Sequence, residues 1–561
     1  MKRTVKILAV ALGVLSVLSS VGCTKQVINS SDENKNATKL SVYNYNGGVG
    51  TEWLYAAEAR FEELYKDVSF EEGKMGVNIE VAPQKLSQAT VATQPYDVFF
   101  TESVNFNDLV AQNLLLDLTD MVTAPLSNVK GCTETGSIAD KLFTEHQEAL
   151  TALDGKYYCL PHYECYMGMS YDRDLFNKKS LFIQEGQGDT KFTNLQGNLS
   201  VGPNGVRGDY DDGLPSSNEE FEKLMARMVK LNIVPCIYTG LYPTYTTTLL
   251  SGSWANYAGL DEWMLNVNFD SNKGDEEVLA EIITGFEDGN PVIEKQAITD
   301  ETGYLLSQQA SKYYALSLMN SIVGKAENIS SKVTEVLSHL DAQNEFIFSS
   351  LEGKPIGMLI EGSWWYAEAH EALAASASAY PQTGIERDFS FMPLPVQFKG
   401  QVTEGNGKKN TLFDGLSAYC FVSASIKNNP VKVELAKAFL QFLYTDAELA
   451  NFTRSTSNFK GVKYNVNEED FSSMSKFAAH MYEIRSNSDI VHPVSNSKIF
   501  VNAQTKFYYN LDTSAYASTI GDSDYRHPVS AFVQGETAID YFKGMKVDQK
   551  TWVDSYGSYF D

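Results

Sequence analysis

The sequence is poor in positive charge. Its 561 residues include 45 lysines and arginines against 71 aspartates and glutamates, a net charge of −26. A surface this acidic repels phosphate backbones, which argues against nucleic-acid binding. Hydrophobic residues at 43% and charged residues at 21% are close to the averages for soluble globular proteins, which excludes a disordered or collagen-like chain. The length allows two to four domains, or two large lobes.

Long hydrophobic runs are missing except at the N-terminus, which excludes a bundle of membrane-spanning helices. Ile7–Gly22 is a stretch of 16 apolar and small residues behind Lys2, Arg3 and Lys6. A membrane span needs about 20 residues, whereas a secretory signal peptide has a shorter apolar region. The sequence Ser20-Val-Gly-Cys23 resembles a lipobox. We therefore predict a lipoprotein signal peptide at residues 1–22 and lipidation of Cys23, with an ordinary signal peptide as the alternative.

The segment after Cys23 has almost no apolar residues. It runs to Thr38 and is rich in Ser, Asn, Lys and Asp, so it cannot bury enough surface to fold. We predict that residues 23–38 are a lipid anchor and flexible tether with a reach of roughly 20 Å. The protein would then sit on the extracellular face of the cell membrane and touch it only through the anchor.

Cysteine pairs and metal-binding patterns are also lacking. The five cysteines after Cys23 include no Cys-x-x-Cys. Cys159 and Cys165 could form a disulfide bridge, but we expect both to be free thiols that pack as small buried apolar residues. The seven histidines show no metal-ligand spacing, and we expect no metal and no cofactor. Gly208–Gly213 suggests a calcium loop, but its glycine is misplaced for an EF-hand and position 12 has no aligned Glu. We expect a turn before a helix there.

What is present is a succession of strands and helices. A β-type run at 40–45 ends in glycines, and apolar spacings of four, four and three then predict a helix from Trp53 to Leu64. Further strands are expected at 77–81 and 96–100. This alternation predicts parallel pairing with right-handed crossovers, and ligands bind such sheets beyond the C-terminal strand ends.

The same alternation continues along the chain. Strands are expected at 233–238, 357–360, 389–392 and 416–422, helices at 219–231 and 431–452, and polar loops at 186–212 and 400–410.

Read in order, these pieces resemble the family 1 extracellular solute-binding proteins, the maltose-binding-protein-like receptors of ABC sugar importers. The matching pieces, which span about residues 40–460, are Val42–Gly48, Tyr96–Phe100 with Leu114–Asp120, Asp154–Pro161 with Ser170–Phe176, Asp212–Ser217, Gly357–Trp365, and Met392–Pro395 with Leu435–Leu440.

The resemblance implies an α/β fold of two lobes joined by a hinge, with a ligand cleft between them. Residues 39–160 plus about 405–460 would form the N-terminal lobe, and 161–404 plus about 461–561 the C-terminal lobe. The chain would cross the hinge near Leu160–Glu164 and between Pro395 and Asp414. The implied partners are a carbohydrate, most simply an oligosaccharide, and ABC permease subunits, and the protein would be a monomer.

Sugar recognition suggests which residues contact the ligand. Pyranose rings have weakly apolar faces and hydroxyl rims, which match aromatic rings and polar side chains respectively. By resemblance, Trp364 and Trp365 follow a cleft strand where a tryptophan stacks on sugar, and one of two adjacent rings should lie in the core. The other candidates follow the first, third and cleft strands, the predicted hinge, the first helix or an aromatic segment: Asn46, Gly47, Trp53, Thr101, Glu102, Ser103, Tyr163, Glu164, Tyr242, Tyr245 and Glu361.

Other functions stay open. A surface glycoside hydrolase needs a pair of carboxylates, which 71 acids cannot exclude, although no hydrolase signature such as Gly-x-Ser-x-Gly occurs. A scaffold or adhesion lipoprotein, or a receptor for a peptide or a polyamine, are further alternatives. We predict that the chain is not an enzyme. It has no Walker motif, so any ATP is hydrolysed by a partner.

Overall fold

A computed structural model describes residues 36–84, 91, 93–186, 188–273, 276–381, 387–396, 410–507 and 527–560. The predicted signal peptide at 1–22, Cys23 and most of the predicted tether lie outside the described residues. None of the helices in the described ranges combines the length and the apolarity that a membrane crossing needs.

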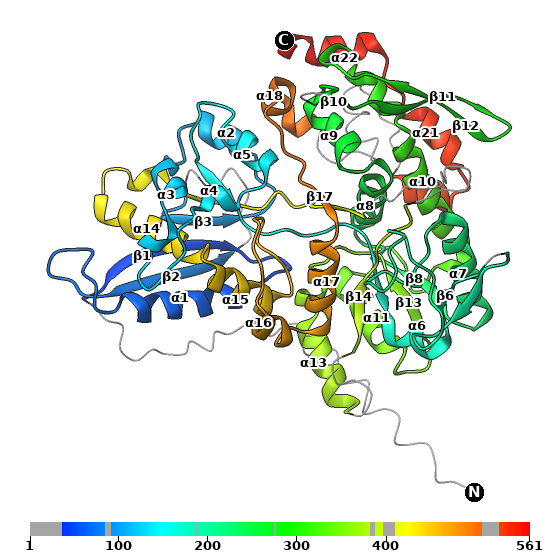
Figure 1. Cartoon of the computed structure of the whole chain (residues 1–561), viewed down its shortest axis with the longest axis horizontal. Helices are drawn as coiled ribbons and strands as arrows, with labels where there is room; N and C mark the ends of the chain where they lie inside the picture. The colour runs from blue at the N-terminus through cyan, green and yellow to red at the C-terminus, as the bar shows by residue number, and fades with distance from the viewer. Residues whose placement is uncertain are drawn as a thin grey trace, which may run out of the picture.

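The first lobe is built on a five-stranded sheet of order β2-β1-β3-β16-β4. Strands β1 (Thr38–Tyr45), β2 (Val77–Gln84) and β3 (Val98–Thr101) are parallel, as the sequence predicts. Strand β16 (Tyr419–Val422) joins them antiparallel to β3 and to β4 (Cys159–Pro161). The sheet therefore combines the start of the chain with a segment more than 250 residues later; in Figure 1 the yellow helix α14, which follows β16, lies beside the blue strands.

Helices cover this sheet. Helix α1 packs against β2 with its buried Trp53, Ala57 and Phe61, and α14 packs against β1. The helices of this lobe are α1 (Glu52–Tyr65), α2 (Phe106–Ala111), α3 (Thr119–Thr123), α4 (Ile138–Lys141), α5 (Thr144–Leu150), α14 (Pro430–Leu443) and α15 (Asp446–Thr456).

One long helix predicted at 431–452 is two helices. Helix α14 ends at Leu443, and the side chain of Thr445 accepts a hydrogen bond from the backbone of Glu448 to start α15. The apolar periodicity continues across the break, which is why the sequence suggested a single helix. A threonine N-cap satisfies a backbone donor that has no partner within the helix.

The second lobe is built on a four-stranded sheet of order β14-β5-β13-β8. Its strands are β5 (Ser170–Asp172), β8 (Val234–Ile237), β13 (Ile356–Leu359) and β14 (Phe389–Phe391). Its helices include α6 (Arg173–Lys179), α7 (Asn218–Lys230), α8 (Thr247–Ala258), α9 (Leu260–Asn268), α10 (Ala310–Val323), α11 (His339–Ser349), α12 (Trp365–Glu368) and α13 (His370–Ala379). Small antiparallel pairs are β6 (Phe182–Gln184) with β7 (Lys191–Thr193), β9 (Asn272–Lys273) with β10 (Glu276–Glu277), and β11 (Ala280–Glu287) with β12 (Asn290–Gln296).

The chain after residue 460 runs from the first lobe to the second. Helix α16 (Glu468–Ser472) packs against α15, and α17 (Lys476–Ser486) packs against β14. Strand β17 (Asp489–Val491) then pairs in parallel with β15 (Thr411–Phe413), between the two main sheets in Figure 1. The remaining helices, α18 (Lys498–Phe507), α20 (Pro528–Val533), α21 (Ala538–Gly544) and α22 (Gln549–Tyr556), pack on the second lobe.

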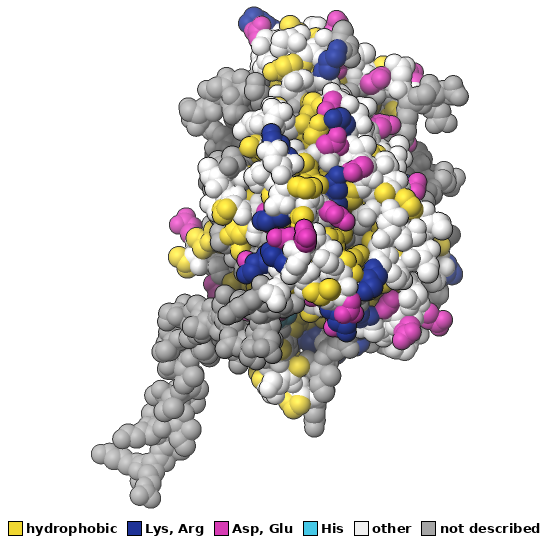
Figure 2. Space-filling view, turned by 90° about the vertical axis from the view of Figure 1, so that its left-hand side faces the viewer, with side chains coloured by type: hydrophobic (Ala, Val, Ile, Leu, Met, Phe, Trp, Pro, Cys, Tyr) yellow, Lys and Arg dark blue, Asp and Glu magenta, His cyan; other side chains and the backbone are white. Residues whose placement is uncertain are grey.

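Buried apolar residues form a core that links the lobes. One cluster joins residues of the first sheet, such as Leu40 and Phe99, to Phe389 of the second sheet and Phe477 of α17. The five cysteines after Cys23 are free thiols, and all except Cys132 are buried. On the face in Figure 2, acidic and basic side chains are interspersed, so no patch of one sign marks a docking surface there.

Candidate functional site

The loops that follow several strand ends meet between the two lobes. In the first lobe these are the loops after Tyr45 of β1 and Thr101 of β3, and in the second lobe the loop after Leu359 of β13. The C-terminal edge of parallel strands is where α/β sheets place ligands. The loop after β1 and the loop after β13 meet directly, because Gly48 of the first packs against Trp364 of the second.

Trp364 forms the direct contact between the lobes at this point. A methyl group added to Gly48 would lie 2.7 Å from Cδ1 of Trp364, so the backbone after β1 packs against the indole. The ring also lies over Gly362, where an added methyl would be 1.9 Å from Cζ3 of Trp364. Glycine is therefore required on both sides of the ring. Trp364 keeps 8% of its surface exposed.

A row of rings extends from Trp364 along the second lobe. Tyr245, in the 3-10 helix η4 (Pro243–Thr246), meets the Trp364 ring edge-on at 6.2 Å between centroids. His339, the first residue of α11, stacks on Tyr245 at 5.2 Å and lies 5.6 Å from Tyr242. Tyr242 is 43% exposed. The exposed Tyr242 and the half-buried Tyr245 offer apolar ring surface on which a pyranose ring would stack, next to the buried Trp364.

Polar side chains lie behind the rings. Nε2 of Gln343 donates hydrogen bonds to Glu361 at 2.9 Å and to Glu368 at 2.8 Å, and His339 lies 3.3 Å from Glu368. Burial raises the pKa of Glu361 well above its usual range, with Glu368 adding to the effect. Among the described residues, Oε1 of Gln343 and Nδ1 of His339 are buried without a hydrogen-bond partner. Two buried polar atoms behind the rings thus lack a hydrogen-bond partner among the described residues.

The first lobe contributes Tyr45, Gly47 and Glu102 to the same place. A methyl on Gly47 would lie 2.6 Å from Oε1 of Glu102 and 2.7 Å from Cε1 of Tyr45. Burial raises the pKa of Tyr245, and the negative charges of Glu368, Glu361 and Glu102 raise it further. This influence of side chains from both lobes on one hydroxyl places them around a common site.

Two other predicted residues lie at the loops of the first lobe. Asn46 is exposed, and its Oδ1 accepts a hydrogen bond from Oγ1 of Thr51 at 3.2 Å. Ser103 is exposed with a φ of 52°, and its backbone amide donates to the carbonyl oxygen of Leu416.

Three of the predicted residues lie in the core. Trp53 is 4% exposed, with its ring 5.1 Å from that of Phe452 and 4.4 Å from Nζ of Lys460. Thr101 is buried and donates to the carbonyl oxygen of Tyr419 at 2.9 Å. Trp365 is fully buried, and its Nε1 donates to Oγ of Ser170 at 2.8 Å. Both adjacent tryptophans belong to the same buried cluster, but Trp365 is completely enclosed, whereas Trp364 lies at the contact between the lobes.

Tyr163 and Glu164 lie where the chain leaves the first sheet, and both are buried. Glu164 accepts hydrogen bonds from Nε of Arg485 at 2.8 Å and from the hydroxyl of Tyr166, and it contacts Nε2 of His492 at 3.0 Å. The pKa of Glu164 falls to about 2 because these cationic partners outweigh the opposing effect of burial. The carboxylates of Glu164 and Glu145 raise the pKa of His492 to about 10, against the effect of its burial. This buried cluster joins α5, the crossing segment, α17 and the residues after β17.

Four residues of the site were missed from sequence: Gly48, His339, Gln343 and Glu368. His339 and Gln343 are four positions apart in the helix that the Ser338–Asp341 capping box starts, so the sequence could have placed them on one helix face. It could not have shown that this face is turned toward Glu361.

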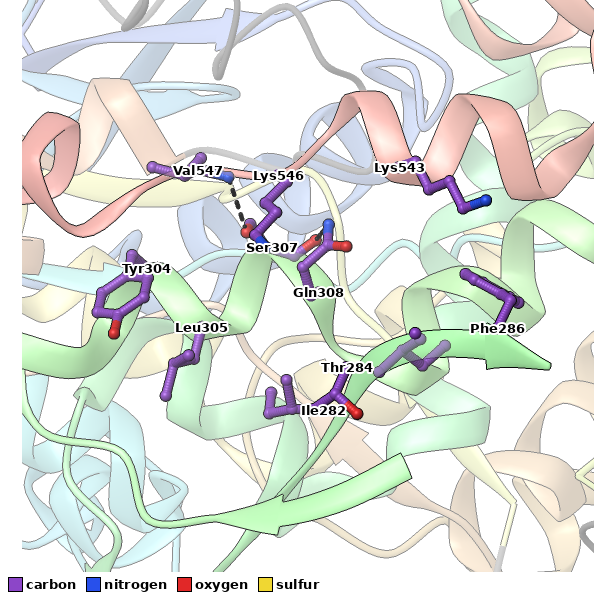
Figure 3. Close-up of a pocket in the computed structure, with 12 residues that line it drawn as sticks. Ile282, Thr284, Phe286, Tyr304, Leu305, Ser307, Gln308, Lys543, Lys546 and Val547 are labelled. Carbon is purple, nitrogen blue, oxygen red and sulfur yellow. Dashed lines mark hydrogen bonds between the residues drawn. The ribbon is translucent and has the colours of Figure 1, made fainter. Parts of the chain in front are cut away.

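A separate cavity of about 330 Å³ lies in the second lobe, and no predicted ligand-contact residue lines it. It is formed by β11, α21 and the 3-10 helix η5 (Asp300–Gln308), with Phe286 and Tyr304 among its walls and Lys543 and Lys546 at its border (Figure 3).

Part of the sequence matches a known family model. Residues 46–210 match the model of the bacterial extracellular solute-binding proteins. A search of curated protein sequences finds no match.

Solved structures of similar fold span almost the whole chain. A chitin oligosaccharide binding protein has a TM-score of 0.52 at 15% identity, covering 93% of this chain and 100% of its own. Maltose-bound T. maritima MalE3 has a TM-score of 0.52 at 13% identity, covering 92% and 99%. A binding protein of an ABC transporter from Bifidobacterium animalis subsp. lactis, in complex with mannobiose, has a TM-score of 0.51 at 12% identity, covering 93% and 95%. The resemblance inferred from the sequence and the two-lobed α/β fold are confirmed.

Proposed function

Because the chain has the fold of the bacterial extracellular solute-binding proteins, we propose that it captures a carbohydrate, most simply an oligosaccharide, and delivers it to an ABC permease. The observation that supports this most is the row of Trp364, Tyr245 and Tyr242, in which Trp364 packs against Gly48 in the loop after β1 of the opposite lobe.

The chemistry of the site suits sugars. Aromatic faces pack against the C–H faces of pyranose rings, while the unpartnered Oε1 of Gln343 and the carboxyl of Glu361 can accept hydrogen bonds from hydroxyls. Glu102 brings a further acceptor from the first lobe. A ligand that binds groups of both lobes would favour the conformation in which the lobes meet, because only that conformation offers the ligand all of these contacts.

The first test is thermal unfolding of residues 24–561 with a panel of maltose, mannobiose, raffinose and chitin oligosaccharides, with peptides and polyamines as controls. At 100 times Kd, a ligand stabilises the protein by about 2.7 kcal/mol, a shift of roughly 2–3 °C for a chain of this size. We expect a saturable shift with one sugar class. Trp364→Ala should abolish the shift, and Tyr55→Ala, which removes a 39% exposed ring from α1, should retain it.

The panel also tests the competing functions. Turnover of the bound sugar during incubation would make the protein a glycoside hydrolase rather than a receptor. A flat response to every compound would favour the scaffold alternative.

A positively charged ligand is the second candidate, because the site is acidic. Glu102, Glu361 and Glu368 all act on the hydroxyl of Tyr245, and aromatic rings with carboxylates bind ammonium groups. A polyamine or an amino sugar would then give the largest shift, and its affinity would fall as salt rises, whereas binding of a neutral sugar would not.

Lipid anchoring through Cys23 completes the proposal. The receptor would remain at the extracellular face of the membrane as a monomer, with the tether separating it from the lipid surface. Replacing Cys23 with Ala should release the protein into the medium and reduce uptake of the ligand by whole cells. Retention of the variant at the membrane would contradict the anchor and leave ligand capture untouched.

A further inference from the structure

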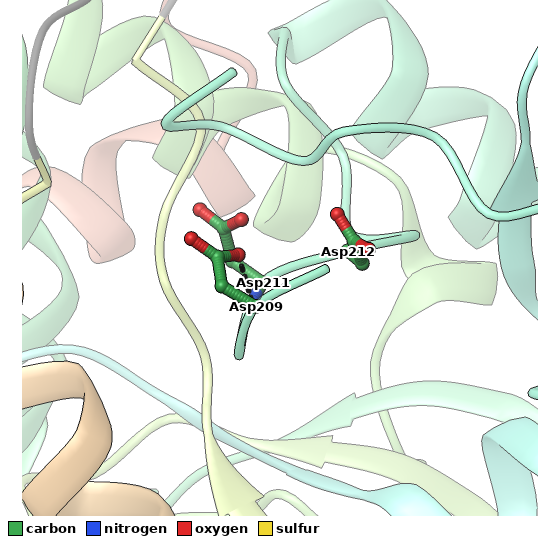
Figure 4. Close-up of side chains that lie close together, drawn as sticks. All are labelled: Asp209, Asp211 and Asp212. Atoms are coloured by element: carbon green, nitrogen blue, oxygen red, sulfur yellow. Dashed lines mark hydrogen bonds between the residues drawn. The ribbon is translucent and has the colours of Figure 1, made fainter. Parts of the chain in front are cut away.

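Three carboxylates lie together in a loop of the second lobe, outside the proposed ligand site. Asp209, Asp211 and Asp212 lie before α7 and offer oxygen atoms that are all within 4.8 Å of one another. Figure 4 shows Asp209 and Asp211 next to each other, with Asp212 facing them. Such a grouping is electrostatically unfavourable unless something compensates for the charge.

In both Asp211 and Asp212, one carboxylate oxygen accepts hydrogen bonds from the loop and the other oxygen has no partner. Oδ2 of Asp211 accepts hydrogen bonds from the backbone amide of Asn204 at 3.0 Å and from Nδ2 of Asn410 at 2.9 Å. Oδ2 of Asp212 accepts from the amide of Gly208 at 2.8 Å. Among the described residues, Oδ1 of Asp211 and Oδ1 of Asp212 are buried with no hydrogen-bond partner.

The free oxygen of Asp211 is energetically costly where it lies. Its exposed fraction is 0%, so water does not solvate the free oxygen, and buried polar atoms in proteins are rarely left unpaired. No lysine or arginine of the described ranges forms an ion pair with any of the three carboxylates, and the nearby Arg207 pairs with Glu185 instead. A buried, uncompensated carboxylate calls for a cation from solution.

We propose that this loop binds a divalent cation, and that the cation is calcium. The donors are all oxygen, which excludes the thiolate and imidazole sites typical of zinc. Calcium accepts irregular shells of six to eight oxygens at about 2.3–2.6 Å, whereas magnesium requires a near-perfect octahedron and retains its waters. The mismatch of residues 208–213 with the EF-hand pattern therefore excludes an EF-hand loop, but it does not exclude calcium binding by another kind of loop.

The ion would stiffen a connection between the lobes. Nδ2 of Asn410 donates to Asp211 and also to the hydroxyl of Tyr210 at 3.0 Å. The carbonyl oxygen of Asn410 accepts from the amide of Asp489, next to the paired strands β15 and β17 that cross between the two sheets. An ordered loop at Asp211 thus supports the segment along which the chain passes from one lobe to the other.

The test is thermal unfolding of residues 24–561 after EDTA treatment, with CaCl₂ titrated back and MgCl₂ in a parallel series. We expect a saturable rise in Tm of about 2–3 °C at 100 times the calcium Kd, and calorimetry with one calcium per chain. Magnesium should give a smaller shift at the same concentration. The measurement needs no sugar, so it is independent of the proposed function.

Asp211→Asn is the decisive variant. It keeps the shape and removes the buried charge, so in EDTA its Tm should equal or exceed that of the wild type, while calcium should no longer shift it. Asp209→Ala, at a partly exposed position, should also abolish the shift and serves if Asp211→Asn does not fold. Glu63→Gln, which removes an exposed charge from α1, should leave the response unchanged. An unshifted wild type, or an equal shift in both loop variants, would overturn the proposal.

Discussion

Glu164→Gln should destabilise the protein while leaving its ligand affinity unchanged. The carboxylate is completely buried and its partners are Arg485, Tyr166 and His492. Glutamine has almost the same shape, so it creates no cavity. It leaves the cationic side chain of Arg485 without the carboxylate that compensates it, and His492 with Glu145 as its remaining carboxylate partner.

The magnitude follows from the pKa of Glu164. Its decrease from 4.5 to about 2 corresponds to about 3 kcal/mol of stability, at about 1.4 kcal/mol for each pH unit. Breaking a buried ion pair from one side costs about 3–5 kcal/mol, which agrees with this value. The pKa shifts of Arg485 and His492 arise partly from the same interactions with Glu164. Their energies are therefore not added to this value.

The pH dependence has a definite sign. A carboxylate with a lowered folded-state pKa stabilises the protein above its unfolded-state pKa, and this stability is lost as the pH falls from about 4.5 toward 2. His492 is the opposite case. Because its folded-state pKa is raised from 6.5 to about 10, its contribution is complete below pH 6.5 and is lost as the pH rises toward 10. The cluster should therefore stabilise the protein most between about pH 4.5 and 6.5.

Urea unfolding followed by tryptophan fluorescence tests this expectation. We expect a difference of about 3 kcal/mol between wild type and Glu164→Gln at pH 6, shrinking as the pH is lowered through 4. Glu80→Gln is the matched control: it removes a carboxylate from the exposed pair with Lys39 and should cost less than about 1 kcal/mol at every pH. Equal stability of Glu164→Gln and wild type at pH 6 would refute the reasoning.

Three further substitutions probe the site. Trp364→Ala should raise the Kd of the sugar at least tenfold by calorimetry, because the indole packs against Gly48 of the opposite lobe and its removal takes away the contact at which the lobes meet; unchanged affinity would remove Trp364 from the site. Gly48→Ala should raise the Kd about 5- to 150-fold, because its methyl would lie 2.7 Å from Trp364 where the lobes meet, and overpacking costs about 1–3 kcal/mol. The control is Gly186→Ala, whose methyl meets no atom within 4 Å and which should bind the sugar like the wild type. Glu361→Gln should change stability and affinity by less than about 1 kcal/mol at pH 7, because the amide keeps the shape of the carboxyl and burial disfavours its charged form, raising its pKa; a large loss would show that the charged form is needed.

Local patterns in the sequence were sufficient to predict much of the fold. The period of apolar residues placed β1, α1, β2 and β3 and their parallel pairing, because which side of a strand or helix is buried is written into spacings of two to four residues. The order of short motifs carried the resemblance to a two-lobed receptor. The same patterns failed at Thr445, where a cap interrupts a continuous apolar period.

The roles of individual side chains depended on partners that the sequence does not identify. Trp364 and Trp365 are neighbours with the same chemistry, and only the packing of the lobes assigns one to the interlobe site and the other to the core. Glu164 is bound by Arg485, 321 positions away, and Asp211 by Asn410, 199 positions away. Periodicity reports that a side chain is buried, whereas the charge or ring that it meets is set by how distant segments come together. The sequence by itself determined the strand–helix units of the first sheet and, through the resemblance, the two-lobed fold, and the tertiary structure decided which residues form the site.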